Sequence, residues 1–189
     1  MTLQRDLFAT DAPVLAGFQL VPDAVTPAEE AHLAAQIDAA PLRPFEFGQW
    51  RGKRMTTHYG SAYDFARGRL DEASPLPGWL LALRERLAPL VGMDPATLEA
   101  ALLIRYDPGA GIGWHRDRPQ YGEVLGLSLG APCTMRLRRR TEGGFARRKV
   151  ELPPRSLYRL SGEVRRDWEH SIAPMALTRR SITLRTLRR

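Results

Sequence analysis

Short strand-like runs at close spacing fill the second half of the chain, and they constrain its fold more than any other feature. Each run has five to seven residues, which is the usual length of a strand. Turn signals such as Asp107-Pro108-Gly109, Gly143-Gly144 and Pro153-Pro154 separate several of them. The runs are Ala101–Tyr106, Val124–Leu129, Cys133–Arg138, Arg148–Leu152, Ser156–Leu160 and Ser181–Leu187.

The first third of the chain has a different pattern of residues. It begins with an apolar strand predicted over Leu15–Val21. Thr26 and Glu29 then form a capping-box pair that predicts a helix to about Ala40. Its buried face includes Leu33 and Ile37, which are four residues apart.

A hairpin and a second helix are predicted after Pro44. Aromatic and polar residues alternate from Glu46 to Phe65 around the basic run Arg51–Arg54, which predicts a hairpin with a basic tip. Pro77 opens the second helix, Gly78 to Val91, whose leucines at 80, 83, 87 and 90 line one side.

Helices followed by many strands predict an α+β fold in which the helices pack on a sandwich or jelly roll. The chain of 189 residues has the size of one domain, which we assign to residues 12–189 after a flexible tail at 1–11. No stretch approaches the roughly 20 apolar residues that cross a bilayer. Cys133 is the only cysteine, so we expect a monomer in the reducing cytoplasm without a membrane contact.

Positive charge is concentrated at the C-terminal end of the chain. Residues 1–135 contain 12 basic and 16 acidic side chains, whereas residues 136–189 contain 16 basic and 5 acidic ones. Such asymmetry would give a face that binds phosphates, because arginine and lysine release counterions from a nucleic-acid backbone. Nearly all the cations are arginine, so a compositional bias of the source genome is the alternative.

Histidine occurs only at positions 32, 58, 115 and 170. His115 and Asp117 are two residues apart, so on an extended chain both side chains point to the same side. His170 could complete a triad of two imidazoles and one carboxylate, which leaves positions on iron(II) open for oxygen and a chelating acid. A surface His-Asp pair and a zinc site are the alternatives.

Arg179 and Arg185 are six residues apart near the C-terminus, in the run Arg179-Arg180-Ser181-Ile182-Thr183-Leu184-Arg185. In a strand this even separation places both guanidinium groups on one face and the aliphatic side chains on the other. Two guanidinium groups that face inward are costly unless an anion meets them, and a dicarboxylate is such an anion. An arginine-rich strand that faces water is the alternative.

Five short segments follow one another in the second half of the chain. They are Arg105-Tyr106-Asp107-Pro108-Gly109, Trp114-His115-Arg116-Asp117, Gly126-Leu127-Ser128-Leu129-Gly130, His170-Ser171-Ile172 and the strand from Arg179 to Arg185. In this order they resemble the AlkB family of oxidative demethylases, and the resemblance covers roughly residues 50–189. Upstream of them, the segment from His58 to Phe65 resembles the substrate lid of that family.

The resemblance implies a double-stranded β-helix, which is a jelly roll, with iron(II) at its open end and 2-oxoglutarate and O2 as co-substrates. It implies that N-terminal helices pack on the major sheet, that a hairpin forms a substrate lid, and that His115, Asp117 and His170 hold the iron. The implied reaction is oxidative demethylation of N-alkylated bases in DNA or RNA, as in repair of DNA damage.

The same resemblance assigns Tyr106, Arg179, Ser181 and Arg185 to the binding of 2-oxoglutarate. Tyr106 matches a tyrosine that hydrogen-bonds the co-substrate, and Arg179 matches the arginine that pairs with its distal carboxylate. Ser181 stands where asparagine is frequent in the family, and Ile104 replaces a polar residue, so two hydrogen bonds are weakened while the two arginines remain.

The sequence says less about the substrate than about the metal ligands and the co-substrate. DNA-repair members have an acidic residue two positions after the metal-binding aspartate, and this chain has Pro119 there. A flipped base needs an aromatic or imidazole sandwich, although Tyr63 and Phe65 could instead be core residues and the arginine run 136–140 a solvated face. The residues that we expect to contact substrate are Trp50, Arg51, Arg54, His58, Tyr59, Ser61, Tyr63, Arg118, Arg138 and Arg140.

Two rival functions remain at this stage. The same chemistry could act on methylated protein or another small substrate, or the fold could be a catalytically silent nucleic-acid-binding module. In addition, Gln4-Arg5-Asp6-Leu7-Phe8 resembles the peptide that docks into bacterial sliding clamps, which predicts a clamp contact through Gln4–Phe8.

Overall fold

The computed structural model describes residues 15–47, 50–64 and 67–188. The expected tail at residues 1–11, its Gln4–Phe8 segment and Phe65 lie outside these ranges. Within them, no helix is long and apolar enough to cross a membrane.

A seven-stranded antiparallel sheet, which we call the major sheet, is the largest element of the fold. Every strand pair in it is antiparallel, so consecutive residues of a strand point to opposite faces. In spatial order its strands are β1 (Phe18–Val21), β11 (Leu157–Leu160), β8 (Tyr121–Gly130), β13 (Arg179–Leu187), β6 (Leu98–Tyr106), β3 (Trp50–Tyr59) and β2 (Arg43–Phe47).

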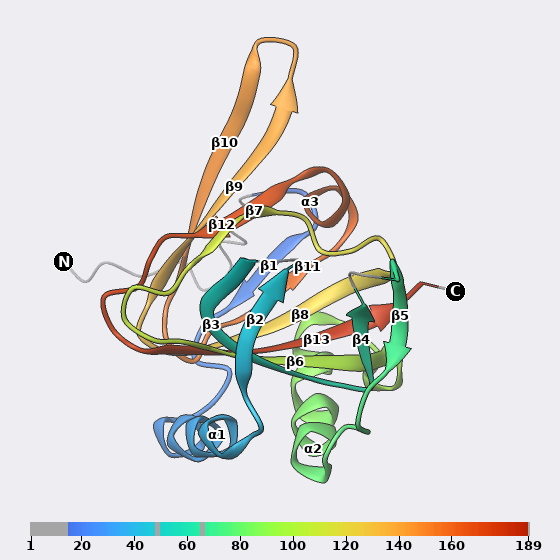
Figure 1. Cartoon of the computed structure of the whole chain (residues 1–189), viewed down its shortest axis with the longest axis vertical. Helices are drawn as coiled ribbons and strands as arrows, with labels where there is room; N and C mark the ends of the chain where they lie inside the picture. The colour runs from blue at the N-terminus through green and yellow to red at the C-terminus, as the bar shows by residue number, and fades with distance from the viewer. Residues whose placement is uncertain (1–14, 48–49, 65–66, 189) are drawn as a thin grey trace, which may run out of the picture.

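A four-stranded antiparallel sheet, the minor sheet, faces the major sheet. Its strands β9 and β10 form a long hairpin that extends beyond the body of the molecule (Figure 1). A separate small hairpin consists of β4 (Ser61–Asp64) and β5 (Arg69–Glu72). In spatial order the minor sheet contains β10 (Gly144–Leu152), β9 (Cys133–Thr141), β12 (Glu169–Ile172) and β7 (Ile112–His115).

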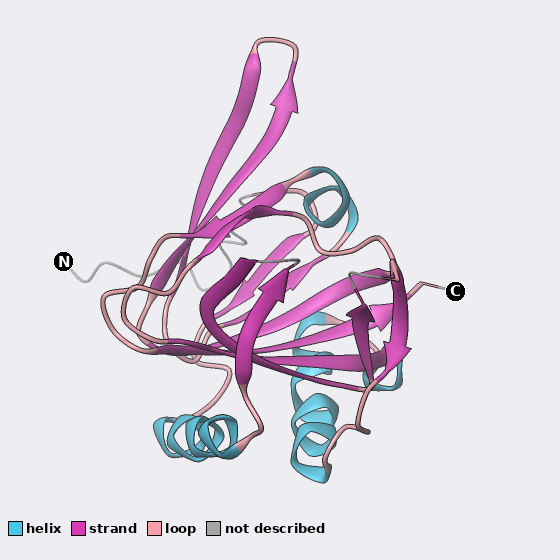
Figure 2. Ribbon diagram, in the orientation of Figure 1, coloured by secondary structure: helices cyan, strands magenta, loops and turns pink. Residues whose placement is uncertain are grey.

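Two helices, α1 (Pro27–Ala39) and α2 (Gly78–Leu87), lie on the same side of the major sheet (Figure 2). The predicted capping box of α1 is confirmed, because Thr26 and Glu29 each accept a hydrogen bond from the other's backbone N–H. A 3-10 turn at Ala88–Val91 continues α2, a second one covers Pro95–Thr97, and a short helix α3 (Gly162–Asp167) precedes β12.

Two hydrophobic cores hold these layers together. The first lies between the helices and the major sheet and includes Ile37 and Leu80 together with Leu103 on the sheet. The second lies between the two sheets and includes Tyr106 and Leu137. The expected α+β class is therefore confirmed, and the facing antiparallel sheets are consistent with a double-stranded β-helix.

All six strand runs predicted in the second half of the chain are strands. The basic hairpin tip is wrong, because the run Arg51–Arg54 lies inside β3, which already pairs with β2 at Trp50. Leu90 is also wrong as a core leucine, since it is 50% exposed. The tighter 3-10 turn that begins at Ala88 rotates it out of line with Leu80, Leu83 and Leu87.

Gly126 of β8 lies directly opposite Tyr158 of β11, and a methyl group at this position would overlap the tyrosine ring. Tyr158 is buried and lines the cavity between the sheets. The missing side chain at Gly126 therefore makes the room in which the ring of Tyr158 closes one wall of that cavity.

We expect Gly126→Ala to lower the free energy of unfolding by about 1–3 kcal/mol, because the added methyl group overpacks a filled site. Urea unfolding followed by circular dichroism would measure the change. Gly143→Ala is the matched control, since a methyl group there meets no atom within 4 Å and should be almost neutral. Equal stabilities of the two variants would contradict the steric role of Gly126.

Candidate metal centre and co-substrate cavity

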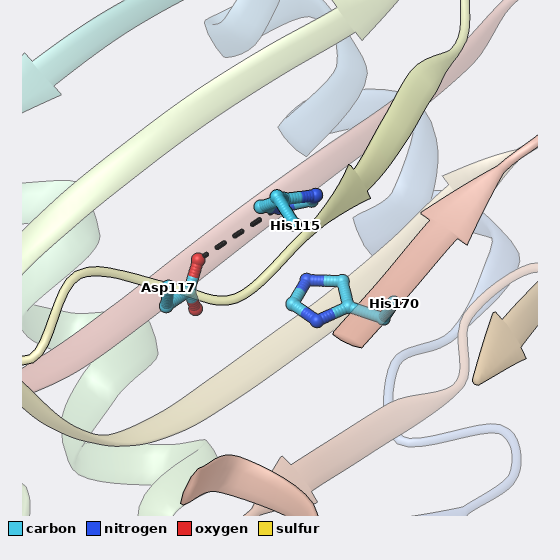
Figure 3. A group of neighbouring side chains, drawn as sticks. All are labelled: His115, Asp117 and His170. Atoms are coloured by element: carbon cyan, nitrogen blue, oxygen red, sulfur yellow. Dashed lines mark ion pairs between the residues drawn. The ribbon is translucent and has the colours of Figure 1, made fainter. Parts of the chain in front are cut away.

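Two short strands of the minor sheet bring the candidate metal ligands together. His115 at the end of β7 pairs directly with His170 of β12, and their rings lie 4.2 Å apart at 55°. Asp117 follows two residues after His115, with Oδ1 4.0 Å from His115 Nε2. One potential ligand atom from each of the three residues lies within 4.8 Å of the others, and the side chains converge as Figure 3 shows.

The ring of His115 is oriented by the backbone of its own strand. Its Nδ1 lies 2.9 Å from the carbonyl oxygen of Gly113, so Nδ1–H donates and the proton is assigned to that nitrogen. Nε2 is then the unprotonated nitrogen and can act as the metal ligand. A second hydrogen bond of this kind is what usually fixes the tautomer of a histidine that ligates a metal.

Burial sets the protonation states that a metal requires. It lowers the pKa of His170 to about 3 and also lowers the pKa of His115, so both imidazoles are neutral at neutral pH. Burial raises the pKa of Asp117, but its charged neighbours, Arg185 above all and also Arg165, lower it by more, so the carboxyl is ionised. Two neutral nitrogens and one carboxylate form the donor set that suits iron(II) with open positions.

The triad opens into a cavity of about 570 Å³ between the two sheets. Alternate residues of three neighbouring strands of the major sheet form one wall, because the antiparallel register aligns them in rows. These residues are Arg54, Thr56 and His58 on β3, Leu102, Ile104 and Tyr106 on β6, and Arg179, Ser181, Thr183 and Arg185 on β13.

Arg179 is 1% exposed and is one of the largest fully buried side chains among the described residues. Its Nε donates to Ser128 Oγ at 3.2 Å, whereas Nη1 and Nη2 have no hydrogen-bond partner in the described part of the chain. The guanidinium carbon lies 5.2 Å from the centre of the Tyr106 ring. A buried guanidinium with two unpaired nitrogens fits a carboxylate that enters the cavity.

Arg185 lies nearer to the metal ligands. Its Nη2 is 3.8 Å from Asp117 Oδ1, its Nε has no partner among the described residues, and its guanidinium lies 4.9 Å from the ring centre of Tyr121. Ser181 sits in the same wall, directly opposite Ile104 and Ser128 on the neighbouring strands. The co-substrate residues expected from the sequence thus share one cavity with the triad.

Several residues expected to contact substrate also line this cavity. Arg54 is buried against Phe45, and the Arg118 guanidinium lies 4.7 Å over the ring of Tyr63. His58 has a buried Nδ1 without a partner, and burial, with smaller contributions from Arg185 and Arg54, lowers its pKa to about 4.

Other expected substrate residues lie away from the cavity wall. Tyr59 follows His58 on β3 and therefore points to the opposite face, where it packs against the first core. Ser61 is buried outside the cavity, and Arg138 and Arg140 lie on the β9–β10 hairpin. The backbone of Trp50 and Arg51 belongs to β3, and their side chains are outside the described part of the structure.

Sequence reasoning did not identify Phe45, which lines the cavity, or Arg165, which supports the metal loop. Arg165 is buried in α3, and its guanidinium donates to the carbonyl oxygens of Asp117, Arg118 and Tyr121 at 3.3, 2.8 and 2.6 Å. It therefore fixes the loop that contains the metal carboxylate. Nothing in the local sequence around position 165 signals a contact with a loop more than 40 residues earlier.

We expect Arg165→Gln to lower the affinity for iron(II) by about 10- to 100-fold, because a partner that orients a metal ligand is removed. Anaerobic titration with iron(II) would measure the affinity. Arg166→Gln changes the exposed neighbour and should leave it unchanged. An unaltered affinity in Arg165→Gln, with the fold intact, would show that the loop holds Asp117 without this side chain.

The metal-free protein should lose stability below pH 6.5. The unfolded chain protonates its histidines near pH 6.5, whereas burial keeps His58 and His170 neutral to about pH 4 and 3, so only the unfolded state gains protons in this window. Between pH 7 and 5 the loss is about 2 kcal/mol for each of these two histidines.

Urea unfolding of metal-free protein at the two pH values would measure this loss. His58→Gln should remove about 2 kcal/mol of this loss, because the variant has no imidazole at position 58 to protonate on unfolding. An unchanged loss between pH 7 and pH 5 in His58→Gln would contradict the burial of a neutral imidazole at position 58.

Comparison with known proteins agrees with this geometry. The profile of the 2OG-Fe(II) oxygenase superfamily matches residues 17–188. The "Alkylated DNA repair protein ALKBH8 homolog" of Arabidopsis thaliana is 30% identical over 182 residues, which cover 82% of this chain and 50% of that protein. The "tRNA (carboxymethyluridine(34)-5-O)-methyltransferase alkbh8" of Xenopus tropicalis is 33% identical over 166 residues, which cover 84% of this chain and 25% of that protein.

The chain thus spans half or less of the length of these two relatives. Among solved structures, that of OsALKBH1 superposes with a TM-score of 0.65 over 90% of this chain and 96% of its own, at 14% identity, which bears on the fold alone. The matched profile and the His-Asp-His triad together show that the chain belongs to the 2OG-Fe(II) oxygenase superfamily, as an AlkB homologue that uses iron(II) and 2-oxoglutarate.

Proposed function

We propose that this oxygenase demethylates N-alkylated bases in nucleic acid. The observation that supports this substrate is a second hollow, which we call the arginine pocket, directly beside the metal cavity. It has a volume of about 520 Å³, and Arg116, Asp117 and Arg118 belong to the walls of both. The arginine pocket is completed by Pro119, Arg165, Arg166, Glu169 and Arg188.

The arginine pocket has the charge that a phosphate requires. Five guanidinium groups surround it, and of its two carboxylates Asp117 belongs to the metal site and Glu169 is paired with Arg138. Arg116, Arg166 and Arg188 are exposed and form no ion pair with a described residue. A nucleotide whose base enters the metal cavity would place its phosphate here, where arginine offers bidentate geometry.

The β9–β10 hairpin extends the positive surface. Its register places Arg138 opposite Arg147 and Arg140 opposite Phe145, so these side chains share one face. Arg138 also lies 4.4 Å over the ring of Trp114. This face, with alternating cations and aromatic rings, suits a single strand whose phosphates and bases need both kinds of contact.

The small β4–β5 hairpin supplies the lid in this proposal. Tyr63 of β4 lines the cavity and contacts Arg118, which follows the metal aspartate. Phe45 and Trp114 add aromatic surface to the same cavity. A base that leaves its stack needs such surfaces to replace the stacking that it loses.

The names of the relatives are compatible with this substrate. The Arabidopsis protein is named for repair of alkylated DNA, and the Xenopus protein is named for a tRNA nucleoside. Both names concern nucleic acid, and neither fixes whether DNA or RNA is the substrate of this chain.

The proposed reaction removes the methyl group by oxidation. The substrate, O2 and 2-oxoglutarate give an N-hydroxymethyl base, succinate and CO2, and the hydroxymethyl group then leaves as formaldehyde and restores N–H. When bound, iron(II) and 2-oxoglutarate supply the activation of oxygen. His115, Asp117 and His170 would hold the metal, Arg179 and Arg185 would bind the two carboxylates, and the apolar residues of the second core exclude water.

The protein should release succinate and formaldehyde from oligonucleotides that contain N-methyl bases, and mass spectrometry would measure both products. We expect binding to weaken steeply with salt, and Arg166→Gln/Arg188→Gln to lower the slope of log Kd against log salt by about 2, one unit for each phosphate contact.

Arg43→Gln/Arg86→Gln is the matched control, because it removes two exposed arginines that do not line either hollow. It should retain the slope of the unmodified protein. The proposal fails if neither methylated DNA nor methylated RNA stimulates succinate formation, and turnover of methyl-lysine peptides with little salt dependence would favour a protein substrate instead.

A further inference from the structure

A third buried arginine lines the metal cavity in addition to the two that fit 2-oxoglutarate. Arg54 lies on β3, is 8% exposed, and stacks on the ring of Phe45 with its guanidinium carbon 3.8 Å from the ring centre. It comes two residues before Thr56 and four before His58, which belong to the same wall. The sequence predicted Arg54 to contact substrate from a basic hairpin tip, whereas the structure buries it inside β3.

Arg54 is a buried cation that has no neutralising anion among the described residues. No carboxylate of these residues lies within 4.0 Å of its guanidinium, and the phenol of Tyr106 is close enough to affect its pKa. Burial lowers the pKa of Arg54, but a guanidinium remains protonated at any physiological pH. An uncompensated buried charge is expensive, so such a group usually meets its counter-charge or acceptor in a ligand.

The cavity contains many more positive than negative side chains. Arg54, Arg179 and Arg185 lie in its interior and Arg116 and Arg118 near its mouth, whereas Asp117 is its only carboxylate among the described residues. Iron(II) and the 2-oxoglutarate dianion cancel each other, so the loaded cavity still contains three interior guanidinium groups against one carboxylate.

Alkylated bases differ in charge according to the nitrogen that is alkylated. Methylation at N1 of adenine or N3 of cytosine gives a cation, because that ring nitrogen has no hydrogen to lose. Methylation at N3 of thymine or uracil, or at N1 of guanine, replaces an N–H and leaves the base neutral. A cationic base would add a further positive charge to this cavity, where Asp117 is the only carboxylate among the described lining residues.

Hydrogen bonding favours the same group of bases. A guanidinium has only donors, so it pairs with carbonyl oxygens and not with amino groups. N3-methylthymine presents a carbonyl on each side of the methylated nitrogen, whereas N1-methyladenine presents an amino group and a hydrogen-bearing carbon.

We infer that Arg54 makes this site selective for alkylated bases that are neutral, and that cationic lesions are rejected. The inference rests on the proposed function and names its substrate class. Arg54 is then a specificity-determining residue that contacts the base, and it is not required for the binding of iron or 2-oxoglutarate.

The test compares two oligonucleotides that differ only in one lesion, N3-methylthymine or N1-methyladenine. Binding is measured by fluorescence anisotropy under anaerobic conditions with iron(II) and 2-oxoglutarate present, and turnover is then measured in air. We expect the protein to bind and turn over the neutral lesion at least about 10-fold better, which corresponds to about 1.4 kcal/mol. In Arg54→Gln the ratio should fall toward one.

Two further variants and one further measurement test whether the positive charge of Arg54, and not another property of its side chain, causes the selectivity. Arg54→Lys keeps the positive charge and should still reject the cationic lesion, and Arg86→Gln, which removes an exposed charge on α2, should keep the full ratio. The affinity for 2-oxoglutarate should be the same in Arg54→Gln as in the unmodified protein. Thermal melting of each variant would establish that it is folded.

Three outcomes would overturn the inference. A cationic lesion bound and turned over as well as the neutral one removes the selectivity, while the demethylase proposal stands. A lower affinity for 2-oxoglutarate in Arg54→Gln, with an unchanged lesion ratio, reassigns Arg54 to the co-substrate. Turnover of neither oligonucleotide, nor of any other methylated DNA or RNA, rejects the proposed function and the inference with it.

Discussion

The pairing of β7 with β12 is the interaction on which the site depends. These strands are short, and their hydrogen bonds place His115 and His170 opposite each other although they are 55 residues apart in the chain. Each strand has little apolar surface of its own, so the pairing is held from outside: β12 is also bonded to β9, and Arg165 of α3 clamps the loop after β7. The metal centre is therefore built by tertiary contacts and not by local propensity.

Side chains alternate in direction along each strand of the major sheet, so the sheet has two faces with different roles. The same two-residue period sends Ile182 and Leu184 into the first core and Arg179, Ser181, Thr183 and Arg185 into the cavity. One strand thus stabilises the fold with one face and prepares an anion-binding wall with the other. The guanidinium groups stay inside because the strands that contain them are fixed on both sides.

Sequence alone predicted much of this arrangement, and the misses have physical causes. The six strands predicted in the second half of the chain and α1 are encoded by local pattern and capping, and the spacing of His115, Asp117 and Arg179–Arg185 encodes which side chains share a face. β7, β12 and α3 were missed because segments of four to six residues with few apolar side chains show no clear period. Arg54 was misplaced because a basic run reads as exposed, whereas its burial depends on the register between β3 and β6.

The protruding hairpin has a consequence for the behaviour of the molecule in solution. β10 is the outermost strand of its sheet among the described strands, so one row of its backbone amides and carbonyls is open to strand addition by another molecule. Arg147, Arg148 and Lys149 stand in succession along that edge. Their mutual repulsion across any edge-to-edge dimer opposes aggregation, so the same cations that suit a polyanion also keep neighbouring copies apart.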